Sequence, residues 1–388
     1  MKNKKHIALS LVGIIALGVF SACDGIGNSS SEETSKWENV VDFTVEAKDE
    51  EFKILQLTDP QIIDGNQVRP GREGDFSDQT IDKVDKHAFN CMDYVIQMSN
   101  PDLILVTGDL IYGEFDDNGT VWQELISFMD LYEIPWAPVF GNHEAESKMG
   151  TDWQCQQLKN SKYCLFKQRE LSGNGNYTVG VTRGEELLRV FYMMDTNGNY
   201  NASPESISNG HTITENGLYY DQIEWYEESI QQIKNSYTNT KFSIAMHIPI
   251  QAFNDALSCY GYNGQEDFRL DIDECADKKT EDFGYVDRTK SAEYWDKDYN
   301  FWNSIKANGI DSVFVGHIHA NTASVVYDGI RLGFGLKCST YDSTLYKTST
   351  EKYKLSYWNI GEPVVGATQI KLSADGNIAD TNHIYYKA

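Results

Sequence analysis

Six side chains that can bind a metal ion each follow a short apolar run with the length of a buried β-strand. The clearest run is Leu103–Thr107, which ends in Gly108-Asp109 and so places a carboxylate at a strand tip. The six side chains are Asp59, Asp109, Asn142, His247, His317 and His319. In open α/β sheets, ligands bind at the carboxyl ends of the strands. Core packing does not explain six such groups at five strand ends.

The chemistry of these donors favours a metal centre without thiolate ligands. Carboxylate, amide and imidazole groups suit hard or borderline ions such as iron, manganese and zinc. Tyr112, three residues after Asp109, brings the candidate ligands to seven, although an aromatic ring there could also simply pack. Seven ligands are more than one tetrahedral metal site can use, and the number suits two metal ions that share a carboxylate. Two such ions polarise a phosphate ester, bind hydroxide and neutralise both oxygens of an in-line attack.

The segments between the strand ends predict a layered α/β domain. Residues 79–98 have apolar side chains at helical spacing, and Val121–Met129 repeats the pattern. Strands and helices alternate as far as residue 319. Further strands are expected at 187–194, 242–246 and 311–315, with helices around 223–233 and 295–307. From Ala323 onward, short strands separated by turns should complete a sheet in antiparallel fashion.

The net charge of -25 argues against a nucleic-acid backbone as the main partner, because phosphate binding needs clustered lysine and arginine. No nucleic-acid-binding surface is expected. A small phosphorylated substrate is compatible with the charge, since bound cations make one pocket positive on an acidic surface.

Cysteine usage depends on the compartment. Besides Cys23 there are six cysteines, without the close CxxC spacing of a zinc site. Export would permit disulfides, and the plausible local pairs are Cys155 with Cys164 and Cys259 with Cys275. Cys91 falls on the apolar face of the helix at 79–98, so a buried thiol is expected there.

The ordered set of motifs resembles the calcineurin-like metallophosphoesterase superfamily over residues 50–335. The motifs are Gly108-Asp109, Gly141-Asn142-His143-Glu144, His247 and Gly316-His317-Ile318-His319. The resemblance implies a four-layer αββα sandwich, in which two mixed β-sheets are flanked by helices. It also implies a binuclear phosphoesterase that uses metal-bound hydroxide.

One motif departs from the superfamily pattern. The usual first block is Asp-x-His, whereas this chain has Asp59-Pro60-Gln61, and a glutamine side chain is a poor metal ligand. Gly108-Asp109-Leu110-Ile111-Tyr112 resembles the signature of purple acid phosphatases, in which the tyrosine binds a ferric ion. The strand before Asp59 and the segment Met246–Pro249 look most like the Dcr2-like branch.

The resemblance also implies how the ligands are divided. The first ion would take Asp59, Asp109, Tyr112 and His319, and the second would take Asp109, Asn142, His247 and His317, with Asp109 bridging. The ions implied are iron together with zinc, manganese or a second iron. His143 resembles the histidine that contacts the phosphate and protonates the leaving alcohol, with Glu144 orienting it. The further histidine of larger purple phosphatases has no counterpart in Gln251–Ala256.

The amino-terminal segment predicts export. Residues 1–22 combine early lysines, the apolar run Ile7–Phe20 and the small residues Ser21-Ala22. This arrangement resembles a bacterial lipoprotein signal, which would leave a cell-surface or periplasmic protein attached to the membrane by a lipid on Cys23. An ordinary secretory signal is the alternative. Residues 23–45 would be the lipidated cysteine and a flexible tether.

The remaining chain, residues 46–388, is expected to be one catalytic domain with insertions at about 145–180 and 251–290. A phosphomonoesterase is the leading expectation. A phosphodiesterase that acts on nucleotides, lipid headgroups or cell-wall polymers is the alternative, because the same metal core supports both reactions. A surface binding protein that has kept the fold without catalysis is a third.

Overall fold

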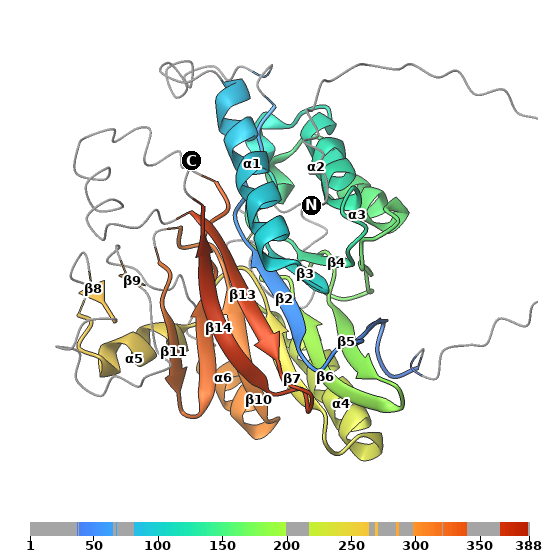
Figure 1. The fold of residues 1–388 in the computed structure, drawn as a ribbon, viewed down its shortest axis with the longest axis vertical. Helices are drawn as coiled ribbons and strands as arrows, with labels where there is room; N and C mark the ends of the chain where they lie inside the picture. Colours follow the sequence, from blue (N-terminus) through green and yellow to red (C-terminus); the bar gives the residue numbers. More distant parts are fainter. Residues whose placement is uncertain are drawn as a thin grey trace, which may run out of the picture. The chain divides into compact units, whose positions relative to one another are not determined.

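Two mixed β-sheets face each other in the computed structural model, and helices cover their outer faces (Figure 1). The residues that the structure describes are 37, 39–64, 67, 81–198, 217–263, 268–270, 285–286, 298–319, 321–339 and 365–386. The signal peptide, Cys23 and most of the predicted tether lie outside them. The arrangement confirms the four-layer αββα fold.

The smaller sheet has five strands in the order β14-β13-β2-β3-β4. Their bounds are β2 (Phe52–Leu57), β3 (Leu103–Thr107), β4 (Trp136–Val139), β13 (Gly366–Leu372) and β14 (Ile378–Tyr385). β2, β3 and β4 run parallel in register, so their carboxyl ends lie at the same edge. Every side chain of β3 is buried, which explains why this central strand has a continuous apolar sequence.

The larger sheet has seven strands in the order β1-β5-β6-β7-β10-β12-β11. Their bounds are β1 (Phe43–Glu46), β5 (Tyr177–Arg183), β6 (Glu186–Met193), β7 (Lys241–Ala245), β10 (Ile310–Val315), β11 (Ser324–Tyr327) and β12 (Ile330–Phe334). β6, β7, β10 and β12 are parallel to one another. A separate two-stranded pair joins β8 (Phe268–Arg269) to β9 (Tyr285–Val286).

The helices divide between the two outer faces (Figure 1). Those beside the five-stranded sheet are α1 (Ile81–Ser99), α2 (Thr120–Asp130) and α3 (Thr151–Asn160), and those beside the seven-stranded sheet are α4 (Tyr220–Ser236), α5 (Gln251–Cys259) and α6 (Asp298–Ala307). One apolar core fills the space between the sheets and beneath α1 and α2, and a second lies beneath α4, α5 and α6. None of the described helices has the length and apolar character needed to cross a membrane.

Several boundaries differ from the sequence predictions. Trp37 and Val41 are buried in the core and β1 pairs with β5, so the fold begins inside the predicted tether. The predicted insertion at 145–180 contains α3 and the start of β5, which belong to the main architecture. The carboxyl-terminal strands are shared between both sheets, because β11 and β12 join the larger sheet while β13 and β14 join the smaller.

The predicted disulfide between Cys155 and Cys164 is wrong. Cys155 and Cys164 are both free thiols. The Cys155 side chain, on α3, is fully buried, and Cys164 is partly buried against the same apolar core. Cys259 is also free and exposed, and Cys275 lies outside the described residues. Cys91 is a buried thiol, as expected.

Candidate metal centre

The predicted donors meet where parallel strands of both sheets end. Asp59 follows β2 and Asp109 follows β3, while His247 follows β7 and His317 follows β10. The two sheets are joined at this edge by the Gln56 side chain of β2, whose Nε2 donates to the carbonyl of Val315 at 3.0 Å. The chain therefore brings residues from distant segments to one buried point.

Several of these residues have left-handed backbone. The φ angles of Asp59, Asp109 and His317 are 49°, 51° and 71°. A left-handed conformation costs a non-glycine residue about 1–2 kcal/mol, and such strain gathers at functional sites. Here it turns each side chain sharply from the strand end towards the centre.

Three donor atoms gather around Nε2 of His247, and we call the four residues together the His247 cluster. Nε2 lies 3.2 Å from Oδ1 of Asn142, 3.3 Å from Oδ1 of Asp109 and 3.3 Å from Nδ1 of His317. Ligand atoms held at about 2.1 Å from one ion lie roughly 3.0–3.4 Å apart in tetrahedral or octahedral geometry. The three distances from His247 Nε2 therefore lie in the range expected between neighbouring ligands of one metal ion.

The surroundings of His247 prepare it as a ligand. Its Nδ1 lies 2.8 Å from the carbonyl oxygen of Thr107, which fixes the N–H on Nδ1 and leaves Nε2 free to coordinate. Burial by itself would lower the pKa of His247, but the charges of Asp109 and Asp59 outweigh burial and raise the pKa to about 10. The two carboxylates thus create a negative potential at this buried position, which favours a bound positive charge.

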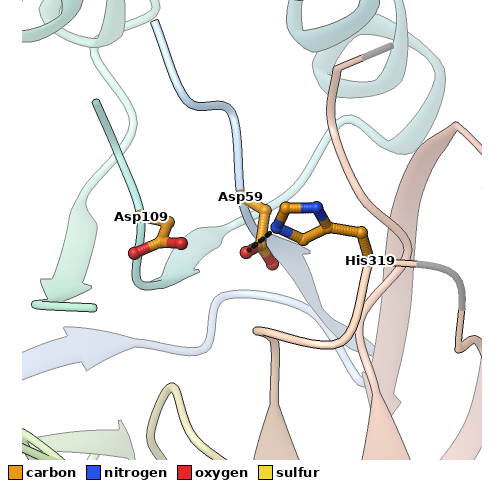
Figure 2. Close-up of side chains that lie close together, drawn as sticks. All are labelled: Asp59, Asp109 and His319. Atoms are coloured by element: carbon orange, nitrogen blue, oxygen red, sulfur yellow. Dashed lines mark ion pairs between the residues drawn. The ribbon is translucent and has the colours of Figure 1, made fainter. Parts of the chain in front are cut away.

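Asp59, Asp109 and His319 form a second group, the Asp59 cluster, whose donor atoms lie within 4.8 Å of one another (Figure 2). Thr58 Oγ1 and the His317 backbone N–H donate to Oδ2 of Asp59, at 2.6 and 3.1 Å. Oδ1 faces Nε2 of His319 at 3.2 Å and has no well-directed hydrogen bond within the described residues. Burial would raise the pKa of Asp59, but His319 outweighs it and lowers the pKa to about 2.

Gln61 lies inside the Asp59 cluster, at the position of the usual histidine. Its Nε2 donates to Oδ2 of Asp109 at 3.1 Å and lies 3.3 Å from Nε2 of His319. Behind it stands Lys337, a buried residue that the sequence analysis missed. The available signal was a lysine between the apolar Leu336 and Cys338, directly after β12.

Glycines precede the donors because the segments touch. A Cβ atom on Gly108, which has φ +87°, would lie 2.4 Å from Nδ1 of His247. A Cβ atom on Gly141 would lie 2.2 Å from Oδ1 of Asp109. Any side chain at either position would displace a ligand, which explains the Gly-Asp and Gly-Asn-His motifs physically.

His143 lies beside Asp109, with its backbone N–H donating to Oδ1 of Asp109 at 3.0 Å. Its ring is 17% exposed, and Nε2 lies 3.8 Å from Oδ2 of Asp109. Burial would lower the pKa of His143, but Asp109 and a hydrogen bond to Glu146 outweigh it and raise the pKa to about 9. A partly accessible, protonated imidazole at the edge of the centre can donate a proton outward.

The role predicted for Glu144 needs correction. The Glu144 carboxylate is fully buried and accepts hydrogen bonds from the backbone N–H groups of Leu110 and Gly141, at 2.5 and 2.6 Å. It therefore ties together the two loops that carry the ligands. Burial and then the charge of Asp109 raise its pKa to about 8. Glu146, which the sequence analysis missed, contacts Nδ1 of His143 instead, at 2.7 Å.

Tyr112 packs against His143, with ring centroids 4.3 Å apart and the planes 29° from parallel. The Phe115 ring also packs against the Tyr112 ring, with their centroids 5.6 Å apart. This packing is the second of the two roles considered for Tyr112, and ligation of an ion by its hydroxyl stays a prediction.

Comparison with known proteins places these features in a family. Residues 52–321, more than half of the chain, match the family described as calcineurin-like phosphoesterase. Phosphatase DCR2 of Saccharomyces cerevisiae is 27% identical over 218 residues, which are 54% of this chain and 36% of that protein. The chain thus spans well under half the length of the first curated relatives that it matches.

Two further similarities were found. Probable inactive purple acid phosphatase 29 of Arabidopsis thaliana is 24% identical over 319 residues, 74% of this chain and 71% of that protein. A dimetal phosphatase structure from Danio rerio is 10% identical, with a TM-score of 0.44, and the alignment covers 87% of this chain and 99% of that one. By the extent of its match over residues 52–321, the chain belongs to the calcineurin-like phosphoesterase family.

Proposed function

We propose that this protein is a metal-dependent phosphomonoesterase. The observation that carries the proposal is the convergence of Asp109, Asn142 and His317 on Nε2 of His247, at 3.2–3.3 Å. An ion of the iron, zinc or manganese class, held by these residues, would supply Lewis-acid activation of the phosphoryl group. The name of the yeast relative, a phosphatase, supports monoester substrates.

The chain's own residues would handle the proton. His143 stands beside Asp109 with part of its ring accessible, and Glu146 holds Nδ1 so that Nε2 is the atom presented to a substrate. From there Nε2–H can bind a phosphoryl oxygen or protonate the leaving alkoxide, a role that contributes about 10²–10⁴-fold to rates. Glu144 would keep the two ligand loops in place without touching the substrate.

The experiment compares two substrates on the purified, metal-loaded protein. We expect hydrolysis of p-nitrophenyl phosphate and little hydrolysis of bis-p-nitrophenyl phosphate. Turnover of the diester alone would replace the proposal with the phosphodiesterase alternative. Absence of turnover with metal bound would support a binding protein, a result that matters because some relatives are named as inactive phosphatases.

We also propose that the protein is exported and anchored through a lipid on Cys23. The support is the sequence of residues 1–23, with its lysines, apolar run and small residues before the cysteine. In a bacterial host, the full chain should incorporate radiolabelled palmitate and enter the detergent phase, and Cys23→Ser should do neither. Unlabelled, fully soluble full chain would contradict the anchor.

A further inference from the structure

The Gln61 side chain occupies the Asp59 cluster with its amide group. Nε2 donates to Oδ2 of Asp109 at 3.1 Å and approaches Nε2 of His319 at 3.3 Å. Two of the three donors that surround this position therefore already have a nitrogen within hydrogen-bond distance. Gln61 is 1% exposed, so it is part of the buried centre.

Lys337 fixes which end of the amide faces the cluster. Its Nζ donates to Oε1 of Gln61 at 2.8 Å and to the backbone carbonyl of Asp59 at 2.9 Å. An ammonium group has donors only, so the atom that it contacts must be the amide oxygen. The NH₂ group consequently points at Asp109 and His319, and the chemistry of the contacts supports this amide assignment.

An NH₂ group in this place does not fit a metal ion. It offers no lone pair to a cation. It donates to Asp109 Oδ2, and its nitrogen lies 3.3 Å from His319 Nε2, so an ion at this position would meet an N–H group where a ligand is needed. The Lys337 ammonium adds a positive charge next to the same position. Of the three donors in the Asp59 cluster, the buried Oδ1 of Asp59 is the one that Gln61 does not contact in the described contacts.

The described contacts of the His247 cluster include no side-chain NH₂ group and no ammonium group. Its carboxylate donor is the other oxygen of Asp109, Oδ1, which lies 3.3 Å from His247. No amide N–H from Gln61 reaches that oxygen in the described contacts, since Gln61 donates to Oδ2. Oδ1 accepts only the backbone N–H of His143 among these groups, at 3.0 Å, whereas Oδ2 faces the Gln61 amide that occupies the Asp59 cluster.

We propose that Gln61 and Lys337 close the Asp59 cluster to metal, so that the chain binds a single ion, in the His247 cluster. The hydrogen-bonded amide then holds Asp109 and His319 where the sequence predicted a first ion. The inference rests on the proposed metal-dependent function only in requiring that one ion binds. It replaces the two-metal expectation for this chain.

Counting bound ions tests this directly. The purified chain is dialysed against Mn²⁺, and the bound metal is measured by elemental analysis and by electron paramagnetic resonance. The wild-type chain should bind one Mn²⁺ with the six-line signal of an isolated ion. Gln61→Glu has the same shape and should keep one oxygen on Lys337 while presenting the other to the cluster. We expect it to bind two Mn²⁺ with a spin-coupled signal.

Lys337→Met should also admit a second ion, because it frees the amide to turn its oxygen towards the cluster. Lys234→Met is the matched control: Lys234 also donates to a backbone carbonyl, that of Asn308, at 2.6 Å, but on α4. It should still bind one ion. The wild-type count and Gln61→Glu keep the test decisive if Lys337→Met does not fold.

Three results have distinct meanings. Two tightly bound, coupled ions in the wild-type chain would overturn the inference and leave the proposed function standing. A single ion in Gln61→Glu would also overturn it, because the carboxylate removes the obstacle without changing the shape. A wild-type chain that binds no ion at all would contradict the proposed function itself.

Discussion

Nδ1 of His143 lies 2.7 Å from Oε2 of Glu146, three residues further along the same short turn. The carboxylate holds the imidazole with Nε2 towards the metal centre. It also raises the pKa of His143, after the larger contribution of Asp109 and against the effect of burial. This pair links a positioning residue to the proposed proton donor.

Glu146→Gln should reduce kcat towards p-nitrophenyl phosphate by about tenfold, a fraction of what general acid catalysis contributes. Removing the carboxylate lowers the pKa of His143, so the alkaline limb of the kcat profile should move to lower pH. Bound metal should be unchanged. Glu51→Gln, an exposed change beside Lys371, is the control. An unshifted alkaline limb would exclude the positioning role.

Glu144→Gln should act on stability. An amide has one oxygen, so it can satisfy either the Leu110 or the Gly141 backbone N–H and leaves the other buried and unpaired. We expect the free energy of unfolding to fall by about 1–3 kcal/mol, measured by denaturant titration. Glu146→Gln serves as the comparison, with a smaller loss. If Glu144→Gln kept full stability and lost only kcat, Glu144 would not stabilise the fold by joining the two ligand loops.

Gly108→Ala should be more destabilising than Gly329→Ala. Both glycines have similar positive φ angles, +87° and +81°, so both variants pay the left-handed penalty of about 1–2 kcal/mol. Only at Gly108 does the added methyl group meet a ligand, 2.4 Å from Nδ1 of His247, which adds about 1–3 kcal/mol. Thermal unfolding and metal content should separate them. Equal melting temperatures and equal metal content would contradict the close approach.

His383 should make the fold sensitive to acid. Burial lowers its pKa to about 4, and the neutral ring lies between Thr368 Oγ1 and the carbonyl of Thr322. Because the folded pKa is below the unfolded value of about 6.5, this stabilisation is complete above pH 6.5 and is lost as the pH falls towards 4. The loss reaches about 3 kcal/mol at most.

Denaturant titrations of wild type and His383→Gln at pH 7 and pH 4.5 measure this contribution. The difference in unfolding free energy between the two pH values should be smaller in the variant, because it lacks the contribution of His383. All other acid-sensitive groups are the same in both proteins. The same pH dependence in both proteins would show that His383 does not contribute.

Apolar strand runs that end in a polar residue were enough to predict a layered α/β domain and the meeting of donors, whereas the two-sheet αββα arrangement was implied by the family resemblance. In β3, for example, burial on both faces forces an apolar sequence, and the change to Gly108-Asp109 marks its end. Three glycines also mark these strand ends, because neighbouring segments lie too close there for a side chain: Gly108, Gly141 and Gly316.

The remaining features depend on contacts that no local pattern encodes. Lys337 contacts Gln61 across 276 positions of sequence, so neither residue predicts its partner. Glu144 and Glu146 lie in one turn and differ only in direction, towards the ligand loops or towards His143. Cys155 and Cys164 are near in sequence, yet both are free thiols.

The most direct test of the central claim is hydrolysis of p-nitrophenyl phosphate by the protein before chelation, after chelation and after metal is restored. Activity should disappear with the metal and return when Mn²⁺, Zn²⁺ or iron is added back to the wild-type chain. His247→Ala, which removes the atom on which the other donors converge, should recover neither metal nor activity. Hydrolysis that survives chelation, or that returns in His247→Ala, would contradict the account.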